Sequence, residues 1–139
     1  MKKREPVSSI MTREVITVNH TDSLDVAERF FKTKNIRHIP VVSGNKIIGM
    51  LSYTDLLRIS FADAVVEDSE TVITQVYNLF TIEHVMAKNI ISVSSDTTIK
   101  ETAEILARRE FHAIPVLDNN QLVGIVTTTD LINYLLDQY

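Results

Sequence analysis

One stretch of this chain occurs twice, and this internal repeat restricts the possible fold more than any other feature. Residues 36–57 carry an Ile-Pro-Val-Val run, a glycine and an aspartate, and residues 111–132 carry the same features in the same order. Equivalent landmarks such as Asp55 and Asp130 are 75 positions apart, so the copies align without a gap from Met11 to Leu57. A chain of 139 residues has the length of one ordinary domain, so we expect the two copies to share a core.

Composition excludes several classes of function. Apolar residues make up 45% of the chain and charged residues 23%, as in globular proteins. The net charge is −4 without a long basic run, which argues against nucleic-acid binding. There is no cysteine, the opening Met-Lys-Lys-Arg-Glu has no apolar signal-peptide core after it, and no apolar run is long enough for a membrane span. We therefore expect a cytoplasmic protein that binds neither nucleic acid nor membrane.

The hydrophobic period of the first copy switches between strand and helix. The pattern predicts a short strand at 15–18 and a helix from about Leu24 to 34–35, with Ser23 as its N-cap. Residues 39–42 and 47–51 are predicted to form an antiparallel hairpin around the turn at 43–46. A second helix is expected from Thr54.

The second copy predicts the same order of elements: a strand at 90–93, a helix from 98 or 99 to 109, hairpin strands at 114–117 and 121–126, and a helix from Thr129. Thr98 and Glu101 form a capping-box pattern. Each copy is therefore a β-α-β-β-α unit of an α/β (α+β) fold. Because the hairpin strands are continuously apolar, we expect burial on both faces, with the two sheets packed face to face about a pseudo-twofold axis.

These patterns place the domain boundaries. We expect repeat one at 8–60, a connecting helical segment at 61–81 and repeat two at 82–139. Within the connection, Phe61, Val65 and Val66 can extend the preceding helix. Val72, Val76, Leu79 and Phe80 have the spacing of an amphipathic helix. Such a helix can pack over the repeats, form a dimer contact or act as a signalling lever.

The residues offer no support for catalysis. No cysteine nucleophile, Gly-x-Ser-x-Gly elbow or glycine-rich phosphate loop is present, and the four histidines lack metal-ligand spacing. We expect neither an enzyme nor a metal site.

Two groups of polar residues follow the repeated glycine at a strand-to-helix turn. We call Ser52, Thr54 and Asp55 the first hydroxyl–acid set, and Thr127, Thr129 and Asp130 the second. A carboxylate in the first turn of a helix is stabilised by the helix dipole, and its two oxygens can accept both hydrogens of a vicinal diol such as a ribose. The same residues are also ordinary helix caps, and that alternative remains open.

Basic residues stand at the start of the neighbouring hairpin strand in each copy: Arg37 and His38 in the first, and His112 in the second. They are the available cations for a phosphate group, or else solvated strand ends. Copy two has Ala113 where copy one has His38. We therefore expect phosphate to be held better near copy one, and the second site to be weaker or to prefer a less charged ligand.

The chain resembles a tandem pair of CBS (cystathionine-β-synthase) domains, an arrangement called a Bateman module. The resemblance rests on residues 10–12 and 85–87 at the copy starts, on the two Ile-Pro-Val runs, and on the two glycine-to-aspartate segments. It implies binding of adenosine-containing ligands (AMP, ADP, ATP, sometimes S-adenosylmethionine) in clefts between the repeats. Asp55 and Asp130 would bind ribose, with the hydroxyls of the two hydroxyl–acid sets beside them. The basic residues Arg37, His38 and His112 would face phosphate. The implied adenine-lining strands are Val15, Ile16 and Thr17, and Ile90, Ile91 and Ser92.

The resemblance also implies a function. Such modules commonly pair into homodimers and regulate enzymes or channels, so we expect a stand-alone energy-sensing regulator that acts in trans on a protein effector. An adenine nucleotide would be its regulatory ligand, and no further cofactor would be required. The alternatives are a ligand-independent dimerisation or interaction module with vestigial clefts, or an S-adenosylmethionine binder.

Overall fold

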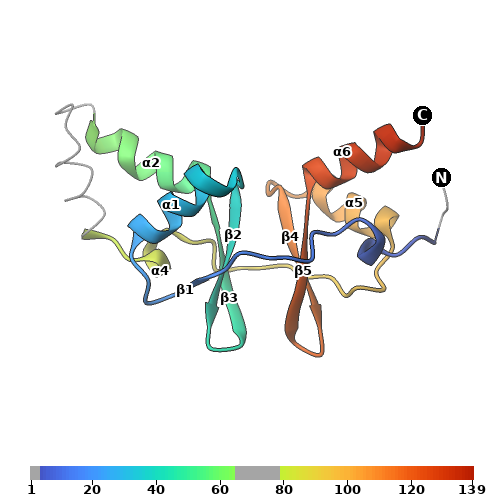
Figure 1. The fold of residues 1–139 in the computed structure, drawn as a ribbon, viewed down its shortest axis with the longest axis horizontal. Helices are drawn as coiled ribbons and strands as arrows, with labels where there is room; N and C mark the ends of the chain where they lie inside the picture. Colours follow the sequence, from blue (N-terminus) through green and yellow to red (C-terminus); the bar gives the residue numbers. More distant parts are fainter. Residues whose placement is uncertain (1–3, 65–78) are drawn as a thin grey trace. The chain divides into compact units, whose positions relative to one another are not determined.

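The computed structural model describes residues 4–64 and 79–139, which form two compact units. The first-repeat unit is Ile16–Ile90, and the second-repeat unit combines Met1–Val15 with Ile91–Tyr139. The chain passes from one unit to the other at Val15–Ile16 and again at Ile90–Ile91 (Figure 1). The compact units are therefore offset from the sequence repeats, because the start of each repeat packs with the body of the other.

The first-repeat unit is a three-stranded sheet with helices packed against it. Its elements are β1 (Val18–Asn19), α1 (Leu24–Lys34), β2 (His38–Ser43), β3 (Lys46–Ser52), α2 (Tyr53–Ala64) and α4 (Ile82–Val85). The strand order is β1-β2-β3, with β1 parallel and β3 antiparallel to β2. Gly44, in the hairpin turn, has a φ of +62°, a conformation that glycine adopts without steric cost.

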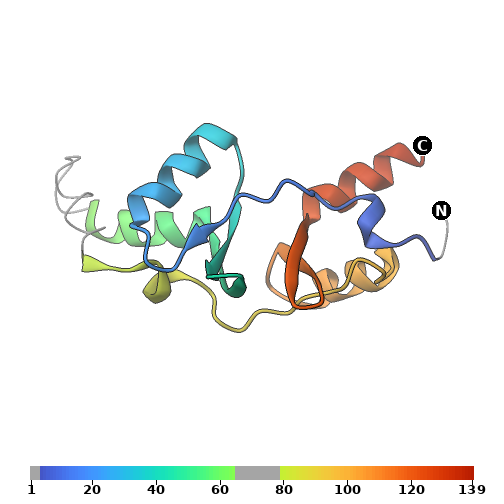
Figure 2. The ribbon, with the colours of Figure 1, turned by 60° about the horizontal axis from the view of Figure 1, so that its bottom comes forward.

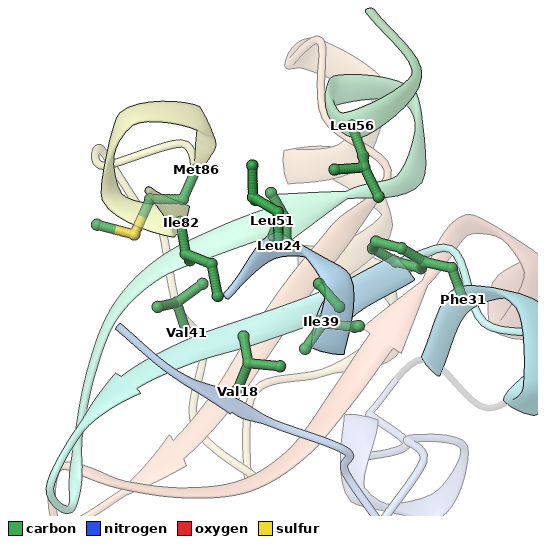
Figure 3. Close-up of a cluster of buried hydrophobic side chains, with 10 residues drawn as sticks. Val18, Leu24, Phe31, Ile39, Val41, Leu51, Leu56, Ile82 and Met86 are labelled. Carbon is green, nitrogen blue, oxygen red and sulfur yellow. The ribbon is translucent and has the colours of Figure 1, made fainter. Parts of the chain in front are cut away.

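A single apolar cluster holds this unit together (Figure 3). Leu24, Ala27 and Phe31 lie at helical spacing on α1 and are buried. They meet buried side chains from the sheet, from α2 and from the segment around α4: Val18, Ile39, Val41, Leu51, Leu56, Ile82 and Met86. Helix α1 begins after Ser23 and ends at Asn35, whose left-handed φ of 54° stops the helix.

The second-repeat unit repeats this plan with a smaller sheet. Its elements are the 3₁₀ turn η1 (Val7–Ser9), α5 (Ile99–Arg108), β4 (Ala113–Asp118), β5 (Gln121–Thr127) and α6 (Thr128–Asp137). Strands β4 and β5 form an antiparallel hairpin whose turn residues Asn119 and Asn120 both have positive φ. The Thr98 hydroxyl caps α5 by accepting the Glu101 backbone N–H at 3.0 Å. The segment that leads into η1 lies beside α5 and α6 (blue in Figures 1 and 2). There the Ile99 backbone N–H donates to the Glu5 carbonyl oxygen at 2.9 Å, and Tyr134 donates a hydrogen bond to the Glu5 carboxylate at 2.6 Å.

Residues 4–15 and 82–90, which begin the two repeats, each belong to the unit formed by the body of the other repeat, and we call them the exchanged segments. They attach to equivalent places in the two units. In the first-repeat unit the backbone of Ala87 bonds with that of Met50 in β3, and in the second-repeat unit Thr12 bonds with Ile125 in β5. Each contact lies next to a repeated glycine. Val7 and Ile82, which stand 75 positions apart, are both completely buried. The repeat starts are therefore structural parts of each core.

The predicted helices, hairpins and α/β repeat order are confirmed, and Phe61 extends α2 as expected. The strand predicted at 15–18 is wrong for 15–17, since β1 comprises only Val18–Asn19. The strand predicted at 90–93 is reduced to one bridge between Val93 and Val116. The residues 15–17 and 90–92 have strand-forming side chains, but they lie where the chain changes units, and no described strand pairs with them. The extension predicted at Val65 and Val66, and most of the helix predicted around Val72–Phe80, fall on residues 65–78, outside the described residues.

Candidate functional site

The first hydroxyl–acid set lies where β3 passes directly into α2. Ser52 is the last residue of β3, and its hydroxyl oxygen accepts the Asp55 backbone N–H at 3.0 Å. Thr54 is exposed in the first turn, and the Asp55 side chain is 27% exposed. Ser52 thus acts as the helix cap, while Asp55 presents a partly exposed carboxylate at the positive end of the helix dipole.

The second hydroxyl–acid set forms a complete capping box at the start of α6. The Thr127 hydroxyl oxygen accepts the Asp130 backbone N–H at 3.2 Å. In return, Asp130 Oδ2 accepts the Thr127 backbone N–H at 2.9 Å and lies 3.2 Å from the Thr127 hydroxyl. The capping alternative is therefore correct for Ser52, Thr127 and Asp130. It does not exclude binding, because a carboxylate has about four lone-pair sites.

Backbone contacts bring two of the predicted basic residues to the same two helix starts. The Arg37 carbonyl oxygen accepts the backbone N–H of Tyr53, the first residue of α2, at 2.9 Å. The His112 carbonyl oxygen accepts the backbone N–H of Thr128, the first residue of α6, at 3.0 Å. His38 pairs with Ser52 across the β2–β3 hairpin. Each acid therefore has a basic residue close by in the fold of its own unit.

Aromatic packing distinguishes the two helix starts. Tyr53 stacks on Phe31 of α1 with ring centroids 5.2 Å apart, which ties the first turn of α2 to the core. The equivalent positions in the second-repeat unit are Thr128 and Leu106, and the Thr128 hydroxyl donates to the His112 carbonyl oxygen at 3.3 Å.

One charged neighbour of the first set was missed by the sequence analysis. Arg58 Nη1 lies 3.8 Å from Asp55 Oδ1, three residues further along α2. The i, i+3 spacing of an acid and a base on a helix is the signal that could have identified it.

The six predicted adenine-lining residues occupy the two crossings between units. Val15, Ile16, Thr17, Ile90 and Ile91 are half-buried, and Ser92 is exposed. None of them is in a strand.

The repeated glycines admit protein atoms rather than a ligand. A Cβ placed on Gly49 would overlap Met86 Sδ and lie 2.8 Å from Met86 Cγ and 3.0 Å from the Ala87 carbonyl oxygen. A Cβ on Gly124 would lie 2.6 Å from Met11 Sδ. A glycine in a strand lets another group approach the backbone closely, and at these two positions the approaching groups belong to the exchanged segments.

Within residues 4–64 and 79–139, no cluster of three or more histidine, aspartate or glutamate residues is placed to hold a metal ion. Within the same ranges, no helix has the length and apolar character needed to cross a membrane.

Comparisons with known proteins identify the family of this chain. The CBS domain model matches residues 7–62 and 82–137. The chain is 30% identical over 132 residues to protein MJ1225 of Methanocaldococcus jannaschii, covering 94% of this chain and 43% of that protein. It is 27% identical to the CBS domain-containing protein YhcV of Bacillus subtilis, covering 90% of this chain and 81% of that protein. The chain also spans only 24% and 23% of two related enzymes, a homoserine O-acetyltransferase and an inosine-5'-monophosphate dehydrogenase.

Solved structures show the same fold. The crystal structure of MJ1225 superimposes with a TM-score of 0.81 at 24% identity, covering 97% of this chain and 49% of that one. The CBS domain pair of protein MJ0100, solved with 5'-methylthioadenosine and S-adenosyl-L-methionine, superimposes with a TM-score of 0.77 at 25% identity, covering 96% of this chain and 98% of that one. With both repeats matched in sequence and in fold, this chain belongs to the CBS domain family.

Proposed function

We propose that this chain is a regulatory module that binds adenosine-containing ligands and has no catalytic activity of its own. One observation carries the proposal: each unit places a carboxylate at a helix start, beside hydroxyls and a basic residue, at equivalent positions. The MJ0100 pair, whose structure was solved with two adenosine derivatives, supports this ligand class at 25% identity. The family match over both repeats supports a regulatory role.

The residues would divide the ligand between them. Asp55 and Asp130 would accept hydrogen bonds from the two ribose hydroxyls, with Thr54 and Thr129 as additional polar partners. The ligand's tail, where it is a phosphate, would lie toward the basic residues Arg37, His38 and His112, and its base would lie against residues 15–17 or 90–92. A charge-assisted hydrogen bond to phosphate is worth about 1.5–3 kcal/mol, which favours a nucleotide where Arg37 is present.

Regulation would act on a separate protein. We infer that the chain senses AMP, ADP or ATP in the cytoplasm and changes its affinity for an effector in trans. Such control requires a ligand that binds two states of the protein with different affinity. The exposed apolar residues Leu57 on α2, and Ile132, Leu135 and Leu136 on α6, are consistent with a homodimer through these helices.

Titration calorimetry tests the proposal, with AMP, ATP and 5'-methylthioadenosine as ligands. We expect at least one of them to bind the unmodified chain. Asp55→Asn or Asp130→Asn should then lower the affinity of the altered site for that ligand at least several-fold. Asparagine keeps an oxygen that can accept a hydrogen bond, so each helix start remains capped while the charge is lost. Unchanged affinity in both variants would mean that neither carboxylate holds the ligand.

A ligand-independent dimerisation module is the second candidate. The capping hydrogen bonds of Thr127 and Asp130 favour it, since they use part of the proposed binding set. Thermal unfolding separates the candidates, because a ligand at a hundredfold excess over its Kd stabilises the fold by about 2.7 kcal/mol. A dimer whose melting temperature no adenosine compound changes would support the second candidate.

A further inference from the structure

The surroundings of the two hydroxyl–acid sets differ in charge. The difference between the basic residues of the hairpin strands is one part of this, and a residue of the following helix adds to it. Asp55 has the Arg58 guanidinium 3.8 Å from its Oδ1 atom. The position equivalent to Arg58 in the second repeat, 75 residues later, is Asn133. In the part of the chain that the structure describes, Asp130 forms no ion pair, and its Oδ2 atom accepts hydrogen bonds from Thr127.

The geometry of the Arg58–Asp55 pair leaves both groups able to bind something else. A separation of 3.8 Å is longer than a hydrogen bond, so this pair consumes neither the guanidinium donors nor the carboxylate lone pairs. The Arg58 side chain is 76% exposed, and helical side chains lean toward the helix N-terminus. Arg58 therefore projects a positive charge over the first turn of α2, where the proposed ribose site lies.

The two sites differ in the charge that stands beside each acid. At the first site, the Arg58 guanidinium lies 3.8 Å from the Asp55 carboxylate, and Arg37 is bonded through its backbone to the start of the same helix. At the second site, uncharged Asn133 takes the place of Arg58, so Asp130 has no equivalent cation three residues along its helix. An anionic tail on a ribose held by Asp55 is repelled by that carboxylate, and a cation 3.8 Å from the carboxylate offsets the repulsion.

We propose that Arg58 is a specificity-determining residue of the first site, where it favours adenosine ligands with a polyphosphate tail over those with an uncharged tail. This inference rests on the proposed adenosine-binding function. Asn133 makes the second site tolerant of uncharged tails. The ligand classes are nucleoside di- and triphosphates on one side, and nucleosides such as 5'-methylthioadenosine on the other.

A reciprocal exchange tests the assignment, because each repeat supplies the matched control for the other. Arg58→Asn is made in an Asp130→Asn background, so that the second site is weakened and the first dominates the titration. Asn133→Arg is made in an Asp55→Asn background, so that the second site dominates. ATP and 5'-methylthioadenosine are titrated into each variant and its background by calorimetry, and circular dichroism verifies folding.

We expect Arg58→Asn to lower the affinity for ATP about three- to tenfold. An exposed charge pair is worth up to about 1 kcal/mol, which is a fivefold effect, and the ATP tail carries several charges. The affinity for 5'-methylthioadenosine should change less than about twofold. Asn133→Arg should raise the affinity of the second site for ATP by a comparable factor. Added salt should reduce the effects of both substitutions.

Three outcomes overturn the assignment or its premise. If Arg58→Asn lowers the affinities for ATP and 5'-methylthioadenosine equally, Arg58 acts by holding Asp55 in place and does not select between ligand tails. If it changes neither ligand while Asp55→Asn weakens both, the specificity assignment fails and the adenosine site stands. If neither of these ligands nor AMP binds the unmodified chain, the proposed function itself fails.

Discussion

The contact between Met86 and Gly49 gives the sharpest prediction about the fold. Met86 is 9% exposed and belongs to the core of the first-repeat unit. Truncation of a buried methionine to alanine removes packed atoms and leaves a cavity, which costs about 2–5 kcal/mol. Substitution Gly49→Ala should cost about 1–3 kcal/mol, because the new Cβ would overlap Met86 Sδ and crowd Met86 Cγ at 2.8 Å.

The two substitutions should not add. Met86→Ala removes the Sδ and Cγ atoms that collide with the new methyl group, so Gly49→Ala should cost less in that background. The Ala87 carbonyl oxygen stays 3.0 Å from the new Cβ, so part of the cost remains. Contacting residues typically show interaction free energies of about 0.5–3 kcal/mol, and we expect a coupling of about 1–2 kcal/mol that favours the double variant.

Urea unfolding of the unmodified chain, the two single variants and the double variant measures this coupling. A matched control combines Gly49→Ala with Met11→Ala, since Met11 contacts Gly124 and not Gly49. That pair should be additive within about 0.5 kcal/mol. If Gly49→Ala is equally destabilising with Met86 present or absent, or couples instead to Met11, then the exchange of segments described above is wrong.

Three further predictions concern the second-repeat unit. Replacing Thr127 by alanine should destabilise the protein by about 0.5–2 kcal/mol in urea unfolding, because a helix-capping oxygen is lost; no change would contradict the capping box. Hydrogen bonds from Ser95 hold the pKa of Asp118 below its ordinary value of 3.8, so this aspartate stabilises the fold above that pH, and the contribution is lost as pH falls through the lowered pKa. Melting curves of Asp118→Asn should therefore lie below those of the unmodified chain at neutral pH and converge with them in acid, whereas a constant difference would refute this reasoning. The hydrogen bond to Glu5 raises the pKa of Tyr134 above 10.0, and Tyr134→Phe should loosen the N-terminal segment and speed tryptic cleavage within residues 4–15, whereas an unchanged rate would show that this bond does not hold the segment.

Much of each unit could be predicted because the signals are local. The capping Thr98 hydroxyl before α5, the left-handed Asn35 after α1, and the turn residues between apolar strands all act within a few positions. The hairpins lie within one or two residues of their predicted bounds.

The exchange of segments could not be predicted, and the reason is physical. Both repeats present the same glycine in the same strand, so a pattern analysis cannot tell whether Met11 packs on Gly49 or on Gly124. The strands at 15–17 and 90–92 were overpredicted for a related reason. β-Branched side chains favour a strand, but a strand forms only where a partner backbone is available.

The candidate site was partly predictable. The spacing from glycine to aspartate identified both hydroxyl–acid sets, and the structure brings Arg37 and His112 to them through backbone hydrogen bonds. Arg58 was overlooked because acid–base pairs at helical spacing are common on exposed surfaces and usually contribute little. Its significance depends on where Asp55 lies in the fold.

A crystal structure of the chain soaked with ATP or 5'-methylthioadenosine tests the central claim most directly. The account predicts ribose hydroxyls within hydrogen-bonding distance, about 2.5–3.0 Å, of the Asp55 or Asp130 carboxylate oxygens. Ligand-free helix starts at saturating concentration, or a ribose bound away from both carboxylates, would contradict it.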